Sequence, residues 1–384
     1  MFISFGVVIA GYVILSLVLF LPVKIPVKIV LAALVALGAS RLAIMRRIFG
    51  GLGGIEAPRW LLLGTSYLQG LLVVLFLILI LRDVLTLGSF LGGIKRTAHF
   101  RSVLRSPEAA VAMVLAAAVI GLAGLYGAAK VPEVKREMVA LPRWPQELDG
   151  LKVAVLADMH ISKFFDRGWV ESVVERTNAE KPDMIWMPGD MVDGTTEARA
   201  PDVAPLAELS APYGVYASLG NHEYISRVRD WLPVFKNLGI EVLQNAHVTA
   251  RIGSAALVVA GVNDQTAQSP RYNMPGPDLG LALAGAPPDL PVVLLDHRPG
   301  RAPLAAREKN VIFQISGHTH GGMMPILKTM VARANGGYLS GFYDVGSMKL
   351  FVAPGLGLWS GFPMRLLTPS EITILTIRSG SPAG

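Results

Sequence analysis

Residues 151–160 read Leu-Lys-Val-Ala-Val-Leu-Ala-Asp-Met-His, and the C-terminal part of the chain repeats this pattern. The run from Leu151 to Ala157 is short and apolar, which predicts a buried β-strand. Asp158 and His160 follow at the point where that strand would end. Ligands of α/β sheets bind at strand ends, because side chains there leave the buried sheet and converge in one crevice. The stretch therefore predicts a strand and the first residues of a site.

Seven more short apolar runs follow along the chain. They are Met184–Met187, Val215–Leu219, Leu257–Val262, Val292–Leu295, Val311–Ile315, Leu350–Val352 and Ile372–Ile377. A helical stretch over Arg167–Asn178, ended by Pro182, separates the first two strands. Strands that alternate with helices indicate an α/β domain, which we place at residues 146–384.

Polar motifs follow four of these later runs. In order they are Gly189-Asp190, Gly220-Asn221-His222-Glu223, Asp296-His297 and Gly317-His318-Thr319-His320. A glycine stands before Asp190, Asn221 and His318, where it lets the backbone turn tightly off a strand. Five of the seven histidines fall in the motifs, and we interpret the other two, His99 and His247, as loop residues outside the site.

The ligand chemistry of the motifs indicates a metal centre. Seven of their side chains, two Asp, one Asn and four His, supply oxygen and imidazole nitrogen and suit Mn, Fe, Co or Zn. A carboxylate can bridge two ions, and two ions about 3.5–4 Å apart can activate a water and stabilise in-line displacement at phosphorus. The chain has no cysteine, which excludes disulfides, thiolate nucleophiles and Cys-ligated metals.

The five motifs, in this order over roughly residues 150–325, resemble those of the calcineurin-like metallophosphoesterase superfamily. The flanking text is similar too, at 187–194 (Met-Pro-Gly-Asp-Met-Val-Asp-Gly) and at 317–322 (Gly-His-Thr-His-Gly-Gly). A looser similarity continues into the tail at 355–357, 363–365 and 369–371. The resemblance implies a four-layer α/β/β/α sandwich with a dinuclear metal site at one edge.

The resemblance also implies a role for each polar residue. Asp158, His160 and His320 would bind one divalent ion, Asn221, His297 and His318 would bind the other, and Asp190 would bridge the two. A metal-bridging hydroxide would be the nucleophile. His222 would be the catalytic residue that protonates the leaving oxygen and steadies the phosphoryl group.

Two acidic residues are expected behind the ligands. Asp193 and Glu223 would orient ligand imidazoles by hydrogen bonding, although Asp193 could equally cap a turn. Two positions depart from the superfamily pattern: Met323 stands where relatives often have Gln, and Asp296 where they often have a small residue. Neither removes a ligand. The Pro- and Gly-rich stretch Gln265–Pro288 is either a plain surface loop or one that shapes the pocket.

The N-terminal part, residues 1–130, reads as a transmembrane helical module, joined by a linker at 131–145. The chain is 52% hydrophobic and 16% charged, and the apolar excess lies at the front. A membrane-spanning helix needs about 20 apolar residues. Four candidate spans are Met1–Val23, Ile25–Met45, Trp60–Leu81 and Ala109–Ala129. The second is the least regular, because its apolar core lies between Lys28 and Arg41. Either these two side chains snorkel to the interfaces and the helix spans, or the whole helix lies in the interface.

Charge separates the two parts of the chain and bears on topology. Residues 1–130 hold 12 of the 35 Lys and Arg residues but 3 of the 28 acidic ones, so the excess positive charge belongs to the membrane module. Nucleic-acid binding would place a basic face on the folded domain instead, and we expect none. The loop at 82–107, with Arg82, Lys95, Arg96, Arg101 and Arg105, is the most basic. By the positive-inside rule this loop slightly favours an extracytoplasmic catalytic domain, although the loops on the two sides of the membrane carry nearly equal numbers of positive residues.

Together these features predict a membrane-anchored, two-metal phosphoesterase of the bacterial inner membrane. The anchor suggests a substrate at the bilayer, so we expect a phosphodiester or pyrophosphate of a lipid-linked or cell-envelope compound. A non-catalytic metal-binding sensor is the alternative, and its mark would be loss of Asp190, Asn221 or His222, all of which are present. A transporter is disfavoured because the three clearest spans carry no ionisable side chain.

Overall fold

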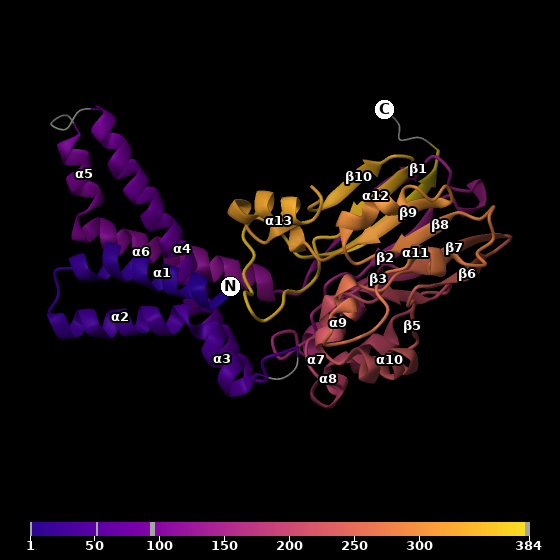
Figure 1. Cartoon of the computed structure of the whole chain (residues 1–384), viewed down its shortest axis with the longest axis horizontal. Coiled ribbons are helices and arrows are strands. Elements are labelled where there is room, and N and C mark those ends of the chain that lie inside the picture. The colour runs from indigo at the N-terminus through magenta and orange to yellow at the C-terminus, as the bar shows by residue number, and fades with distance from the viewer. Residues whose placement is uncertain (1, 51–52, 93–96, 381–384) are drawn as a thin grey trace. The chain divides into compact units, whose positions relative to one another are not determined.

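The computed structural model describes residues 2–50, 53–92 and 97–380, and the chain divides into two compact units (Figure 1). Unit 1 comprises Met1–Gly50, Ala57–Gly127 and Gly361–Met364; unit 2 comprises Gly51–Glu56, Ala128–Ser360 and Arg365–Gly384. Lys95 and Arg96 of the predicted basic loop lie outside the described residues, as do Met1 and residues 381–384 at the two ends of the chain.

Unit 2 contains two six-stranded sheets. The strands are β1 Glu133–Leu141, β2 Leu151–Val155, β3 Met184–Pro188, β4 Val215–Ser218, β5 Ile240–Val242, β6 Ala246–Ile252, β7 Ala255–Gly261, β8 Val292–Leu295, β9 Val311–Ser316, β10 Gly341–Val345, β11 Met348–Val352 and β12 Glu371–Ser379. One sheet has the order β1-β12-β2-β3-β4-β5 and the other β10-β11-β9-β8-β7-β6. All eight strands predicted from apolar runs are present.

The helices are α1 Phe2–Ser16, α2 Ile25–Ala39, α3 Arg41–Phe49, α4 Arg59–Ser89, α5 Ala98–Leu104, α6 Pro107–Ala129, α7 Arg167–Ala179, α8 Thr196–Val203, α9 Asn221–Ile225, α10 Val228–Asn237, α11 Leu279–Leu283, α12 Ala302–Ala305 and α13 Lys328–Ala334. The predicted helix at 167–178 is α7. Its N-cap is Asp166, whose carboxylate accepts a hydrogen bond from the Trp169 backbone N–H and so satisfies an amide that the helix leaves free.

The two sheets pack face to face around one apolar core. Side chains from β2 and β3 meet those of β7, β8 and β9 there, and the Trp186 and Phe313 rings lie 6.4 Å apart across it. A second apolar layer covers the outer face of the β7–β8–β9–β11 sheet, where α11 and α12 contribute buried alanines. On the other side, α10 packs against β5. Helices outside two stacked sheets give the four-layer α/β/β/α sandwich that the motifs predict (Figure 1).

Four strands have no apolar run, and each lies at or next to the outside of a sheet. The segment 131–145, which we expected to be a linker, holds β1, which pairs in parallel with β12 on one side only. Its sequence, Glu-Val-Lys-Arg-Glu-Met-Val-Ala-Leu, is charged because most of the strand is solvated. Edge strands commonly carry charged side chains that prevent pairing with another chain. The strands β5, β6 and β10 are likewise terminal in their sheets.

Unit 1 is helical, and two of its described helices, α4 and α6, are long and apolar enough to cross a membrane. They correspond to the spans predicted at 60–81 and 109–129. The first predicted span is shorter than expected: α1 has 15 residues and ends before a 3₁₀ turn. At about 1.5 Å per residue it falls short of the roughly 30 Å of a bilayer core. Helix α4 continues to Ser89, so Arg82 is helical and pairs with Asp83 instead of lying in the loop.

The predicted span Ile25–Met45 is bent. Helices α2 and α3 meet at Ser40 with an angle of 64°, and together they are long and apolar enough for one broken span. Arg41 does not snorkel as predicted, because its guanidinium is buried and donates to Ser66 Oγ at 2.8 Å and to Gln69 Oε1 at 3.2 Å on α4. The side chains of α4 that accept from Arg41 are Thr65, Ser66 and Gln69, which lie on one face of the helix within about one turn.

Candidate metal centre

The predicted site residues come together from five strand ends within unit 2. Strands β2, β3 and β4 are parallel neighbours in one sheet, and β8 and β9 are parallel neighbours in the other. Their following loops are joined by backbone hydrogen bonds, for example Asp158 N–H to Gly189 O at 3.1 Å and Gly317 N–H to His297 O at 3.0 Å. Parallel strands of one sheet end on the same edge, and the His318 N–H, which donates to Asp158 Oδ1 at 2.9 Å, joins the edges of the two sheets.

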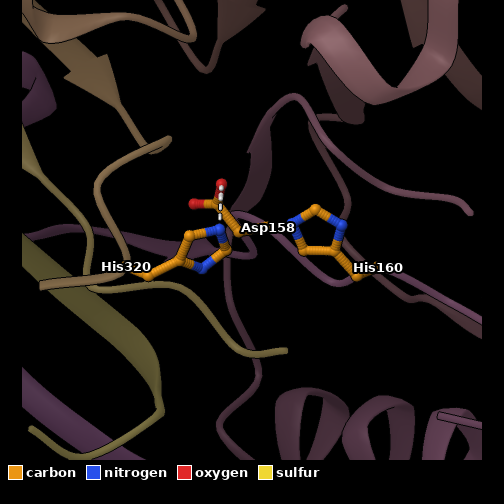
Figure 2. A group of neighbouring side chains, drawn as sticks. All are labelled: Asp158, His160 and His320. Atoms are coloured by element: carbon orange, nitrogen blue, oxygen red, sulfur yellow. Dashed lines mark ion pairs between the residues drawn. The ribbon is translucent and has the colours of Figure 1, made fainter. Parts of the chain in front are cut away.

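Asp158, His160 and His320 form a first group that could hold a metal ion (Figure 2). One ligand atom from each lies within 4.8 Å of the others, and all three side chains are buried. His320 Nε2 lies 3.9 Å from Asp158 Oδ1, and the His160 and His320 rings have centroids 5.1 Å apart. These are the three residues that the motif pattern assigns to one ion.

Asp190, His297 and His318 form a second group of the same kind. His297 Nε2 lies 3.2 Å from Asp190 Oδ2 and 3.2 Å from His318 Nδ1. The other nitrogen of His297, Nδ1, donates to the Pro188 carbonyl at 2.8 Å. That bond turns Nε2 toward the group, which is how ligand imidazoles are usually oriented. Asn221, the remaining predicted ligand, begins α9 beside this group.

The Asp190 carboxylate lies between the two groups. Its Oδ2 is 3.7 Å from His160 Nε2 in the first group and 3.2 Å from His297 Nε2 in the second. Its Oδ1 accepts the backbone N–H of His222 at 2.8 Å, which fixes the orientation of the carboxylate. This position is the one that a bridging ligand requires.

Several buried donor atoms in the groups fit a divalent cation. His160 Nε2 and His320 Nδ1 are buried and have no hydrogen-bond partner. A buried nitrogen without a partner is costly in a folded protein, and an ion bound at His160 Nε2, which lies toward Asp190, would remove that cost there. Burial raises the pKa of the Asp158 carboxyl, whereas the surrounding imidazoles, His297 first, outweigh burial and hold the pKa of Asp190 well below its ordinary value. The donor set therefore fits two ions of the Mn, Fe, Zn or Co type.

Asp193 connects the first group to His222. Its Oδ1 lies 2.5 Å from His222 Nδ1 and 3.3 Å from His160 Nδ1, so one carboxylate orients both rings. Contact with a ligand imidazole, here His160, was expected, whereas contact with His222 was not. Burial raises the pKa of Asp193, but His222 and His160 outweigh it and lower the pKa to about 2. Burial lowers the pKa of His222, but Asp193 and Asp190 outweigh it and raise the pKa to about 9. His222 therefore carries a proton at neutral pH.

Glu223 orients backbone and not an imidazole, in contrast to our expectation. Its Oε2 accepts the N–H groups of Gly220 at 2.7 Å and Asp190 at 3.0 Å. Its Oε1 accepts those of Met191 at 2.6 Å and Val192 at 3.2 Å. The sequence pattern could show that Glu223 was near the site, but not which donors it faces.

The backbone at the site is unusual. Five of the predicted site residues have positive φ, a region that L-residues other than Gly seldom occupy: Asp158 (52°), His160 (48°), Asp190 (54°), His318 (71°) and His320 (48°). Glycines also make room there: a Cβ on Gly317 would lie 2.3 Å from Asp158 Oδ2, and one on Gly220 would lie 2.2 Å from Asp190 Oδ1. Close approach, more than tight turning, explains these two glycines.

Two residues at the site were not identified from the sequence. Arg298, next to His297, donates to Asp264 Oδ2 at 2.6 Å and reaches both Asn221 and His318. Asp264 and the turn that follows it, Gln265–Gln268, pack against α9, so the start of the stretch 265–288 does border the site. The one feature of the sequence that could have indicated Arg298 is the charged triplet Asp296-His297-Arg298 at the end of β8.

A third such residue, Arg365, supports the site from behind. It is buried, and its guanidinium donates to the carbonyls of Pro354 at 2.9 Å, Gly355 at 3.1 Å, Gly357 at 3.0 Å and His320 at 3.3 Å. Gly357 N–H in turn donates to the Asp158 carbonyl at 2.7 Å. Arg365 therefore fixes the loops that carry the first group.

Comparisons with known proteins give the following similarities. The family model for calcineurin-like phosphoesterases matches residues 151–322. A zebrafish (Danio rerio) protein described as a transmembrane protein with metallophosphoesterase domain is 30% identical over 84% of this chain and 74% of its own length. An uncharacterized metallophosphoesterase of Helicobacter pylori is 31% identical over 66% of each chain. Among solved structures, a 5'-nucleotidase precursor of Thermus thermophilus is similar over 59% of this chain and 54% of its own, with 15% identity and a TM-score of 0.39.

At the positions with positive φ, we expect a glycine variant to be more stable than an alanine variant, the reverse of the usual order. At Asp190, where φ is 54°, we expect Asp190→Gly to be more stable than Asp190→Ala by about 1 kcal/mol, because both lose the same carboxylate but alanine keeps the left-handed strain. At His297, which is outside the positive-φ set, the alanine variant should be the more stable. Thermal unfolding of the full chain in detergent with chelator, followed by Trp fluorescence, measures both pairs. Alanine equal to or above glycine at position 190 would contradict the strain.

Proposed function

Because this chain belongs to the calcineurin-like phosphoesterase family, we propose that it hydrolyses a phosphodiester or pyrophosphate bond of a lipid-linked or cell-envelope substrate while anchored in a membrane. The observation that carries the proposal is the position of Asp190 between two groups of buried ligand residues. Two divalent ions held there would supply an activated water and neutralise charge on the phosphoryl group. Displacement at phosphorus needs both the activated water and the neutralised charge, whereas a metal-binding sensor needs neither of them.

The ligand residues divide between the two ions as their grouping suggests. Asp158, His160 and His320 would hold one, and His297 and His318 with Asn221 would hold the other. Asp190 would serve both. Because these residues come from five strand ends tied by backbone hydrogen bonds, the spacing of the two positions is set by the sandwich and needs no rearrangement when substrate binds. Such preorganisation is a large part of catalysis in charged reactions.

His222 would be the general acid. It is partly exposed while its partner Asp193 is fully buried, so the ring can reach a substrate on one side and remain oriented on the other. Its proton would pass from the imidazole to the leaving oxygen as the bond to phosphorus breaks. Asp193 would stabilise the protonated ring before transfer and keep its tautomer fixed, as the buried carboxylate of a catalytic triad does.

Two features support a membrane location and a substrate there. Helices α4 and α6 are long and apolar enough to span a bilayer, and similar proteins from zebrafish and cattle (Bos taurus) are described as transmembrane proteins with a metallophosphoesterase domain. An enzyme fixed in a bilayer meets lipid-linked substrates at high local concentration, whereas it gains nothing for soluble ones. The lipid bilayer is therefore the proposed partner, and no nucleic acid is.

The role of His222 is testable through the leaving group. We expect His222→Ala to lower kcat by roughly 10²–10⁴-fold for an alkyl phosphodiester and much less for a p-nitrophenyl ester, whose leaving oxygen needs no proton. The His222 pKa is about 9, so activity requiring its proton is present below that pH and lost above it. Only the wild type should show this alkaline limb. Rates measured against pH with Mn²⁺ give both results.

The control for that series is Asp190→Asn, which should abolish activity toward every ester and reduce metal content. An equal loss for alkyl and p-nitrophenyl esters in His222→Ala would argue against proton donation. A wild-type chain that binds metal in a lipid environment but cleaves neither phosphodiesters nor pyrophosphates would support the sensor reading instead.

The substrate proposal predicts a preference for lipids. In nanodiscs, the full chain should cleave a diacylglycerol-linked phosphodiester or pyrophosphate with a kcat/KM at least about tenfold above that for the deacylated, water-soluble analogue, because enzyme and substrate share one bilayer and hence a raised effective concentration. In detergent above its micelle concentration, with the substrate diluted among micelles, the ratio should fall. Equal values for both analogues in nanodiscs would rule out a lipid-linked substrate.

We also propose that the catalytic unit lies outside the cytoplasm. Helices α4 and α6 follow one another, so the segment between them is on the opposite side from the unit that follows α6, and that segment is rich in basic residues. A C-terminal alkaline phosphatase fusion, active only outside the cytoplasm, should then be active, and a C-terminal fusion of a fluorescent protein that matures only in the cytoplasm should be dark. The reverse pattern would place the unit inside.

A further inference from the structure

Arg298 places a guanidinium beside the second group of ligand residues. Its Nη1 donates to His318 Nε2 at 3.0 Å, and its Nη2 donates to Asn221 Oδ1 at 3.2 Å. A guanidinium can only donate hydrogen bonds. Arg298 therefore uses the same acceptor side chains, His318 and Asn221, that were predicted to bind a cation. A positive side chain in that place would be repelled by an ion, and its presence calls for an explanation.

The guanidinium is held in place by a buried carboxylate. Asp264 is 2% exposed, and its Oδ2 accepts from Arg298 Nε at 2.6 Å. Asp264 Oδ1 accepts the Thr266 backbone N–H at 2.7 Å, so the carboxylate is itself fixed at the start of the Gln265–Gln268 turn. Asp264 compensates the charge of Arg298 and leaves its Nη atoms turned toward the ligand residues.

Other arginines near the site are used differently. Arg301 pairs with Asp296 at 3.1 Å, and Arg365 donates to backbone carbonyls behind the first group. Arg298 is the one among these three whose Nη atoms reach predicted ligands, and its side chain is still 22% exposed. Its Nη atoms donate to two neutral groups, Asn221 Oδ1 and His318 Nε2, and Nη2 makes longer bonds to Asp264 Oδ1 and Thr266 Oγ1, both at 3.4 Å. An anionic oxygen would be a stronger acceptor, since charge-assisted hydrogen bonds are about twice as strong as neutral ones.

We propose that Arg298 is a phosphate-binding residue, whose Nη groups hold a phosphoryl oxygen of the substrate next to the second ion position. The inference rests on the proposed function, because it assumes that a phosphoryl group binds there. The planar fork of arginine matches two oxygens of a phosphate, and Asp264 orients that fork before substrate arrives. Arg298 acts in binding, and His222 acts in proton transfer.

The test measures binding of inorganic phosphate to the Mn²⁺-loaded full chain in detergent by titration calorimetry, with metal content determined separately. Loss of two charge-assisted hydrogen bonds predicts that Arg298→Ala weakens phosphate binding roughly 10–100-fold while both metals remain. Arg298→Lys keeps the charge but not the planar fork, so its affinity for phosphate should lie between those of the wild type and Arg298→Ala. Arg301→Ala is the matched control, with a side chain 25% exposed and a pair elsewhere, and it should bind phosphate as the wild type does.

Each outcome decides the proposal. Weaker phosphate binding with full metal content, together with a higher KM for ester substrates, supports it. Unchanged phosphate affinity in Arg298→Ala overturns it, and so does loss of a metal ion from that variant, which would make Arg298 a support of the metal centre. These results are distinct from failure of the proposed function, in which the wild-type chain itself would cleave no phosphoric ester. If Arg298→Ala does not fold, Arg298→Lys decides by the same criteria.

Discussion

The buried carboxylate of Glu223 holds the two loops on which the metal centre depends. It accepts four backbone N–H groups, two through each oxygen, from the loop after β3 and from the start of α9. These amides would otherwise be buried without partners, because the loops have left the sheet ladders. Asp190 sits in the first loop and Asn221 and His222 in the second. The relative position of Asp190, Asn221 and His222 is thus set by a side chain that is not itself among the predicted ligands.

The centre combines groups that would be unstable apart. Desolvation alone would raise the pKa of every carboxyl here and lower that of every imidazole. Packed together, the carboxylates of Asp190 and Asp193 and the imidazoles of His222 and His297 keep one another charged. His160 Nε2 and His320 Nδ1 still lack partners. The network is therefore balanced among its charged members but incomplete at His160 Nε2, which lies 3.7 Å from Asp190 Oδ2, as expected of a site whose last partner is a cation.

Short apolar runs that end in Asp, Asn or His predicted an α/β domain whose polar strand ends converge, and the family resemblance added the four-layer sandwich and the division of the ligand residues. Parallel neighbouring strands bring their ends together without further information. The sequence did not predict β1, since an edge strand can be charged. It did not predict the bend at Ser40 either, since the acceptors of Arg41 belong to another helix, α4. Arg298 and Arg365 were missed for a related reason: their partners are a distant carboxylate and main-chain carbonyls, and neither leaves a periodic signal. The role of Glu223 could not be predicted either, because it depends on which backbone N–H groups the folded loops leave without a partner.

The left-handed residues at the strand ends have a consequence for anyone who wishes to move this centre into another scaffold. Ordinary strand ends, continued with ordinary φ angles, would aim the same seven side chains in different directions. Transplanting the centre would require the loops as well: the five residues of positive φ, the glycines that clear space for two carboxylates, and the glutamate that collects the amides. A transplant must therefore reproduce the backbone conformations of these loops as well as the identities of the ligand residues.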